Sequence, residues 1–136
     1  MLEGDIALVT GASRGIGQAI ALALGRAGAV VAGTATTEAG ADRISETLTA
    51  HGCQGAGLVL DVANPASVDS LMERLRSDLG EPSILVNNAG ITRDNLLMRM
   101  KESDWNNILD TNLGSVYRMS KACLRAMPKA RRGRII

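Results

Sequence analysis

Aromatic side chains are almost absent from this sequence, since Trp105 and Tyr117 are the only two. A core without aromatic rings must be built from aliphatic side chains and from small residues that let the backbone approach closely, and the fifteen glycines fit that picture. Net charge is low as well. A formal charge of +1 produces no long-range field that would collect nucleic acid or an anionic membrane, so any anion site must be local.

Cysteine and long apolar runs are also scarce. Cys53 and Cys123 lie far apart without C-x-x-C spacing, so we predict no metal site and expect a reducing, cytoplasmic location. No basic and apolar signal segment precedes the first predicted strand. No apolar run approaches the roughly 20 residues needed to span a bilayer. We therefore expect no contact with a membrane.

The overall composition is that of a globular protein, with 46% hydrophobic and 21% charged residues. A chain of this length buries roughly two-thirds of the surface that its unfolded form exposes, which is enough for one core. We predict a single domain over residues 1–136.

Short apolar runs predict strands that are covered on both faces, as in a parallel sheet. These runs are Ile6–Val9, Ala29–Ala32, Gly57–Leu60 and Ile84–Val86, and a fifth begins at Arg134–Ile136. Because the chain stops inside this fifth run, we expect the domain to be C-terminally incomplete.

Apolar residues at helical spacing predict a helix between consecutive strands. The expected buried stripes are Ile16, Ile20, Ala23 and Leu24; Ala41, Ile44 and Leu48; Val68, Leu71, Met72, Leu75 and Leu79; and Trp105, Ile108, Leu109, Asn112, Leu113, Val116 and Cys123. Asn64 and Pro65 mark the start of the third helix and Gly80 its end. Strands alternating with helices predict an α/β fold with a doubly wound parallel sheet, the Rossmann fold, truncated at the start of its fifth strand.

A glycine-rich turn stands between the first strand and the first helix. Thr10–Gly17 has G-x-x-x-G-x-G spacing, which allows a sharp turn and lets backbone N–H groups approach a pyrophosphate at the helix N-terminus. The candidate cofactor residues in this loop are Gly11, Ser13, Arg14, Gly15, Ile16 and Gly17. A glycine-rich turn without a ligand is the alternative.

The residues after the second strand bear on the choice of cofactor. An acidic residue roughly 20 positions after the glycines would bind the ribose 2′-hydroxyl of NAD, but small hydroxyl residues including Thr36 stand there instead. Arg14 can supply positive charge to a 2′-phosphate. We therefore predict NADP(H). In the alternative reading, Arg14 is a solvated cation and Glu38 binds the ribose.

Together with the glycine loop, Asn87-Asn88-Ala89-Gly90 after the fourth strand resembles the motif pair of short-chain dehydrogenases/reductases. The resemblance implies cofactor contacts at Asn87, Ala89 and Gly90, and at Asp61 and Val62, which follow the third strand and in the family lie beside the adenine. It also implies that Asn112 is the family's active-site asparagine, which perturbs its helix and helps hold a water linked to the catalytic lysine.

The stretch from Gly90 to Lys101 resembles the β-ketoacyl-acyl carrier protein reductases within that family. This branch implies NADPH-dependent reduction of a 3-oxoacyl thioester in fatty-acid synthesis, acyl carrier protein as partner, and a homo-oligomer assembled through the long helix. Another reductase acting on a sugar, steroid or small ketone, or a non-catalytic nucleotide-binding or subunit-interaction module, remains an alternative.

The basic cluster Lys129, Arg131, Arg132 and Arg134 is expected to be a solvated helix terminus, with docking of acyl carrier protein on Arg131 and Arg132 as the alternative. The family's serine and Tyr-x-x-x-Lys follow its fifth strand, beyond this sequence. Tyr117 and Lys121 have that spacing but precede the strand, so we do not predict them to be catalytic. We expect this chain to bind the cofactor and hydride transfer to need the complete protein.

Overall fold

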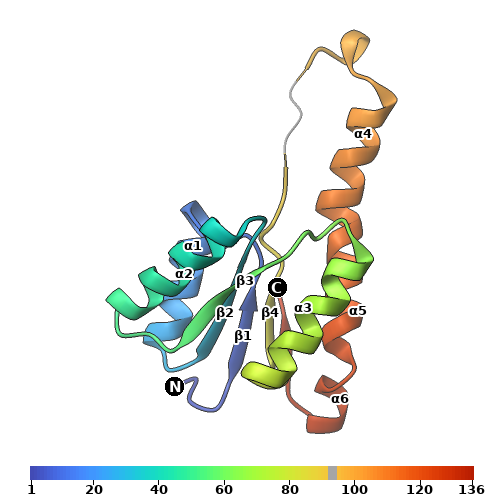
Figure 1. Ribbon diagram of the computed structural model, residues 1–136. Coiled ribbons are helices and arrows are strands. Elements are labelled where there is room, and N and C mark those ends of the chain that lie inside the picture. Colours follow the sequence, from blue (N-terminus) through green and yellow to red (C-terminus); the bar gives the residue numbers. More distant parts are fainter. Residues whose placement is uncertain (92–94) are drawn as a thin grey trace.

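The computed structural model describes residues 1–91 and 95–136, which form one five-stranded sheet in the order β3-β2-β1-β4-β5 (Figure 1). The strands are β1 (Ile6–Val9), β2 (Val30–Ala35), β3 (Gly55–Val59), β4 (Ile84–Val86) and β5 (Arg134–Ile135). The pairings between these neighbours are parallel. The predicted doubly wound parallel sheet is confirmed.

Two hydrophobic cores lie on opposite faces of the sheet. Helices α1 (Gly15–Arg26) and α2 (Glu38–Ala50) pack on the face that carries Ala7, Val9 and Val31. Helices α3 (Pro65–Asp78) and α5 (Ser115–Leu124) pack on the other face, around Leu8, Leu58 and Leu85. Alternating side chains of each strand thus enter different cores, which is why the strands appear as continuous apolar runs.

The strand order reverses between β1 and β4. The chain builds β2 and β3 to one side of β1, then crosses through α3 and places β4 on the other side. In open α/β sheets, the carboxyl ends of the strands on either side of such a reversal form the crevice in which ligands bind. We therefore expect a ligand-binding site at the loops that follow β1 and β4.

The predicted ends of α3 are confirmed. The Asn64 side chain accepts hydrogen bonds from the backbone N–H groups of Ala66 and Ser67, and Pro65 is the first helical residue. Gly80 follows the helix with φ +123°, a conformation that favours glycine. Local turn chemistry was sufficient to locate this helix.

Two shorter predictions need correction. Strand β2 continues through Gly33 and Thr34 to Ala35, three residues beyond the predicted run, because Gly33 pairs with β1 and β3, and Thr34 and Ala35 pair with β3. A side chain at Gly33 would meet Ile44 at 2.8 Å, so the glycine serves packing against α2. In α1 the buried residues are Gly17 and Ala21, whereas two residues of the expected stripe are exposed, Ile16 (75%) and Ala23.

The largest correction concerns the long helix, which starts after the 3₁₀ turn η1 (Leu97–Arg99). It consists of α4 (Glu102–Ile108), a π-helical turn η2 (Leu109–Gly114) and α5, and α4 extends beyond the carboxyl edge of the sheet (Figure 1). Its buried residues are Ser115, Met119 and Cys123. The expected stripe is confirmed at Cys123 and wrong for most of its length, since Trp105, Leu109, Leu113 and Val116 are 54%, 40%, 67% and 38% exposed.

The basic cluster does not form a simple helix terminus. The short helix α6 (Met127–Ala130) has Pro128 as its second residue. Arg131, which follows the helix, adopts a left-handed conformation with φ +53°. Arg132 makes an ion pair with Asp5, a carboxylate that is only 3% exposed and also accepts a hydrogen bond from Ser83 Oγ at 2.7 Å. Arg132 therefore makes a structural contact while its side chain stays 62% exposed, and Lys129, Arg131 and Arg134 are exposed, as expected of a solvated cluster.

Across the described residues, no helix has the combination of length and apolar character that crossing a membrane requires. Residues 92–94, within the stretch used for the subfamily resemblance, lie outside the described part of the chain.

Candidate functional site

The loops at the carboxyl edge of the sheet enclose a hollow of about 760 Å³ between the ends of β1, β2, β3 and β4. It is lined by Gly11, Ser13, Arg14, Gly15, Ile16, Gly17, Thr34, Ala35, Thr36, Leu60, Asp61, Val62, Asn88, Ala89, Gly90, Ile91, Asn107 and Thr111. Every predicted cofactor residue except Asn87 is in this set. Its volume falls within the range of about 300–1,000 Å³ that is usual for ligand pockets.

The glycine loop is held against the end of β2. The Gly11 N–H donates to Thr34 Oγ1 at 3.2 Å, and the Ala12 N–H donates to the Thr34 carbonyl at 2.8 Å. A side chain at Gly17 would lie 2.1 Å from the Gly11 carbonyl oxygen, so only glycine fits where α1 turns back on the loop. The loop is thus tightly closed on itself.

The N-terminus of α1 differs from those of α2 and α3. Thr37 Oγ1 accepts from the Gly40 N–H at the start of α2, and Asn64 caps α3. Arg14 precedes α1, and in the described structure it makes no side-chain capping hydrogen bond. The first-turn amides of α1 are therefore left for a ligand at an end that carries partial positive charge, which suits a pyrophosphate.

A buried threonine connects the two motifs. Thr10 Oγ1 accepts hydrogen bonds from the backbone N–H groups of Asn88 and Ala89, both at 3.0 Å. The Asn88 side-chain Nδ2 in turn donates to the Gly11 carbonyl at 3.0 Å. The sequence pattern included Asn88 in a motif without assigning it to the site, and it missed Thr10 and Thr34, whose hydroxyls fasten the loops.

Asn87 is not brought to the hollow with the other predicted residues. Its backbone N–H donates to the Ile136 carbonyl at 2.7 Å, in continuation of the β4–β5 ladder. Its Oδ1 is buried and has no hydrogen-bond partner among the described residues. Asn87 therefore lies on the β5 side of the loop, while Asn88 faces the glycine loop.

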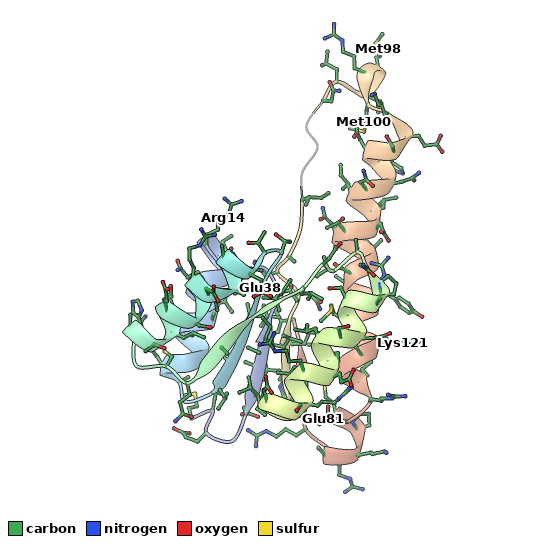
Figure 2. The ribbon with its side chains drawn as sticks, viewed as in Figure 1. Arg14, Glu38, Glu81, Met98, Met100 and Lys121 are labelled. Atoms are coloured by element: carbon green, nitrogen blue, oxygen red, sulfur yellow. The ribbon has the colours of Figure 1, made fainter. Side chains whose placement is uncertain are left out.

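The hollow carries a hydroxyl and a cation beside the end of β2. Thr36 and Arg14 both line the hollow, and both are exposed. Glu38, the acidic alternative for ribose binding, is the first residue of α2 and is not part of the lining. Figure 2 shows Arg14 and Glu38 at this same edge of the sheet.

Asp61 and Val62 complete the wall after β3. Asp61 Oδ1 accepts from the Ala63 N–H at 3.0 Å, which shapes the turn into α3. Val62 is only 7% exposed. An apolar wall beside a turn of this kind suits the flat face of a base, as the resemblance implied.

Asn112 does not line the hollow but holds one of its walls. Its Oδ1 accepts from the Ile91 N–H at 2.7 Å, and its Nδ2 donates to the Ile91 carbonyl at 2.8 Å. It sits in the π-helical turn η2, so the expected perturbation of the helix is present. Through these two hydrogen bonds, Asn112 positions the loop after Gly90.

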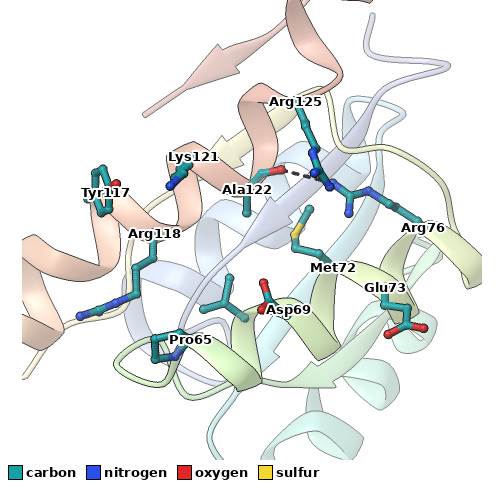
Figure 3. Close-up of a pocket in the computed structure, with 11 residues that line it drawn as sticks. Pro65, Asp69, Met72, Glu73, Arg76, Tyr117, Arg118, Lys121, Ala122 and Arg125 are labelled. Atoms are coloured by element: carbon teal, nitrogen blue, oxygen red, sulfur yellow. Dashed lines mark hydrogen bonds between the residues drawn. The ribbon is translucent and has the colours of Figure 1, made fainter.

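A second hollow, a groove of about 850 Å³, lies between α3 and α5 (Figure 3). Tyr117 and Lys121 lie on its α5 wall, with Lys121 Nζ 5.7 Å from the centre of the Tyr117 ring. None of the predicted site residues lines it. The Tyr117 and Lys121 pair thus lies away from the glycine loop, in agreement with its exclusion as a catalytic pair.

The shifted pKa values also lie away from the hollow. The hydrogen bonds of Arg132, and then of Ser83, hold the pKa of the Asp5 carboxyl below its ordinary value. Burial raises the pKa of the Cys123 thiol to about 12, so this thiol stays protonated and inert. Both groups serve the cores of the protein.

The family model of short chain dehydrogenases matches residues 5–136. The 3-oxoacyl-[acyl-carrier-protein] reductase FabG of Pseudomonas aeruginosa is 64% identical over 135 residues, which cover 99% of this chain and 55% of that protein. The reductases of the same name from Escherichia coli and Vibrio cholerae are 63% and 58% identical, over 98% and 99% of this chain and 54% of each of those proteins.

The chain thus spans about half the length of the curated relatives that it matches. The match to the family model extends across β1 to β5 and includes the glycine loop and the Asn87–Gly90 motif. On these findings, the chain belongs to the short chain dehydrogenase family.

Proposed function

We propose that this chain forms the NADPH-binding part of a 3-oxoacyl-[acyl carrier protein] reductase that acts in fatty-acid biosynthesis. The observation that carries the cofactor assignment is the uncapped N-terminus of α1, whose first-turn amides and Arg14 border the hollow at the switch point of the sheet. The identity of 58–64% to reductases of that name supports the substrate assignment.

Different residues of the hollow bind different parts of the cofactor. The amides from Ser13 to Gly17 receive the pyrophosphate, and Arg14 and Thr36 receive the 2′-phosphate. Asp61 and Val62 flank the adenine, and Ala89 and Gly90 leave room for the ribose. NADPH supplies the hydride for reduction of the thioester's 3-oxo group. Asn112 secures the wall behind Ile91, which keeps the site's shape.

Titration of the protein with NADPH and with NADH tests the cofactor assignment. We expect tighter binding of NADPH, and we expect Arg14→Ala to weaken NADPH binding while leaving NADH binding nearly unchanged. Arg26, a cation in the last turn of α1, supplies the matched control as Arg26→Ala. Equal affinity for both cofactors in the unaltered protein would contradict the assignment, and a preference for NADH would reverse it.

We further propose that the protein self-associates through the outward face of the long helix. Trp105, Leu109, Leu113 and Tyr117 recur every fourth residue and are 54%, 40%, 67% and 66% exposed. A contiguous exposed apolar row of this kind marks an interaction surface. We expect Leu113→Lys to lower the molar mass measured by light scattering, whereas Ala39→Lys, on the exposed side of α2, should not.

Acyl carrier protein remains part of this proposal as the partner that presents the substrate. The basic cluster is poor support for docking, because the turn between α6 and β5 lies at the amino edge of the sheet, opposite the hollow. Arg132 is also ion-paired with Asp5.

A cytoplasmic location is consistent with the two free cysteines, Cys53 and Cys123.

A further inference from the structure

Arg43 lies one turn into α2, and its guanidinium is directed back over the first turn of that helix. A Cβ atom built on Gly40 would lie 3.8 Å from Arg43 Nη2, 3.2 Å from Thr37 Oγ1 and 2.7 Å from Ala35 Cβ. The Arg43 guanidinium, the Thr37 hydroxyl and the Ala35 side chain therefore all lie close to Gly40. This direction is the ordinary one for a long side chain on a helix, which covers the turn N-terminal to its own Cα atom.

A cation at this position is electrostatically unfavourable in the free protein. The N-terminus of α2 already carries partial positive charge, and cations are normally placed at the opposite end of a helix. Glu38, Asp42 and Glu46 share the helix with Arg43, yet no ion pair or hydrogen bond between described residues holds its guanidinium. The Arg43 guanidinium thus has no ion-pair partner among the described residues, although Glu38 and Asp42 place two carboxylates on the first turns of the same helix.

The start of α2 directly adjoins the wall where the adenosine ribose is expected. The residue after β2 recognises the ribose 2′ position in this fold, and here that residue is Thr36, which lines the hollow. The glycine loop that carries Arg14 is tied to the same strand end through Thr34. Arg14 lines the hollow from the start of α1, whereas Arg43 lies outside the lining, with its guanidinium beside Gly40 in the first turn of α2.

We propose that Arg43 is a second cation for the 2′-phosphate of NADPH and that it acts opposite Arg14 as a specificity-determining residue. The inference rests on the proposed NADPH function. A phosphate presents three acceptor oxygens, and two guanidinium groups with the Thr36 hydroxyl supply donors from different sides. The positive end of α2 adds to the attraction. A ligand without the 2′-phosphate gains nothing from Arg43.

Dissociation constants of four ligands, measured by calorimetric titration of the whole chain, test this role. The ligands are NADPH, NADH, adenosine 2′,5′-bisphosphate and 5′-AMP. We expect Arg43→Ala to weaken the two ligands that carry a 2′-phosphate by roughly three- to tenfold at low salt, less at high salt, and to leave the other two unchanged. Arg43→Lys should retain part of the affinity, and Arg26→Ala should change none of the four.

The outcomes separate this inference from the proposed function. If the unaltered protein prefers NADPH and Arg43→Ala keeps that preference in full, Arg43 has no such role, while the proposed function stands. An equal loss for all four ligands would also overturn the inference, because it would show a general effect on the fold. If the unaltered protein binds NADPH no better than NADH, the cofactor assignment itself fails, and the inference fails with it.

Discussion

Replacement of Thr10 by valine should loosen the connection between the two motifs of the site. Thr10 is 1% exposed, and its Oγ1 accepts from the N–H groups of Asn88 and Ala89, both at 3.0 Å. Valine has nearly the same shape but offers no acceptor, so the Ala89 N–H loses its partner, whereas the Asn88 N–H keeps a hydrogen bond to the Val86 carbonyl at 3.1 Å. An amide left unsatisfied in a buried place costs about 1–3 kcal/mol, and we expect a loss in this range from the Ala89 amide.

Thr10→Ser provides the matched control because it keeps the oxygen and loses only a methyl group, at a cost of about 1 kcal/mol. Urea denaturation followed by circular dichroism gives the free energy of unfolding of both variants. The valine variant should also bind NADPH more weakly than the serine variant, because the Asn88–Ala89 backbone borders the hollow. If the valine variant is as stable as the serine variant, the hydroxyl is not the connection we infer.

Two further substitutions test other parts of the structure. Gly17→Ala should abolish measurable NADPH binding, since its methyl group would lie 2.1 Å from the Gly11 carbonyl oxygen, whereas Gly52→Ala, where the methyl group meets only open space, should leave binding intact; calorimetric titration compares them. Asp5→Asn should lower the free energy of unfolding by about 1–3 kcal/mol, because it removes the charge that faces Arg132 from a buried position. The pKa of Asp5 is lowered in the folded state, so its contribution is complete at neutral pH and is lost as the pH falls below the unfolded value of about 3.9; denaturation at a series of pH values should show a flatter acid limb for the asparagine variant.

Much of the fold followed from local chemistry. Asn64, Pro65 and Gly80 delimit α3 because capping and left-handed turns are decided by neighbouring residues. Strand β2 extended further than predicted, since Gly33 interrupts the apolar run, and its pairing with β1 and β3 depends on distant parts of the chain. Tertiary pairing overrides local preference in such cases.

The site was predictable to the extent that its residues belong to the chain's turns. Gly11 to Gly17 and Ala89 to Gly90 meet in one hollow because the carboxyl ends of parallel strands share an edge. The supporting hydroxyls of Thr10 and Thr34 carry no sequence signal of their own, because each resembles any other threonine near a strand end. Asn87 lies outside the lining of the hollow while Asn88 lies within it, because adjacent residues in extended backbone face opposite sides, and the pattern did not say which asparagine faces the hollow.

The long helix shows what periodicity leaves undecided. Two rows with a spacing of four residues run along it: Ser115, Met119 and Cys123 are buried, while the bulkier Leu109, Leu113 and Tyr117 are exposed. Helical spacing identifies a face but not the surface that covers it, so the more apolar row was expected to face the sheet. The π-helical turn Leu109–Gly114 changes the phase between α4 and α5, which no spacing rule for a regular helix anticipates. In this turn, Asn112 is hydrogen-bonded to Ile91, and Leu113 is exposed to solvent. A subunit that packed on the exposed row would therefore contact the same turn that holds one wall of the nucleotide site.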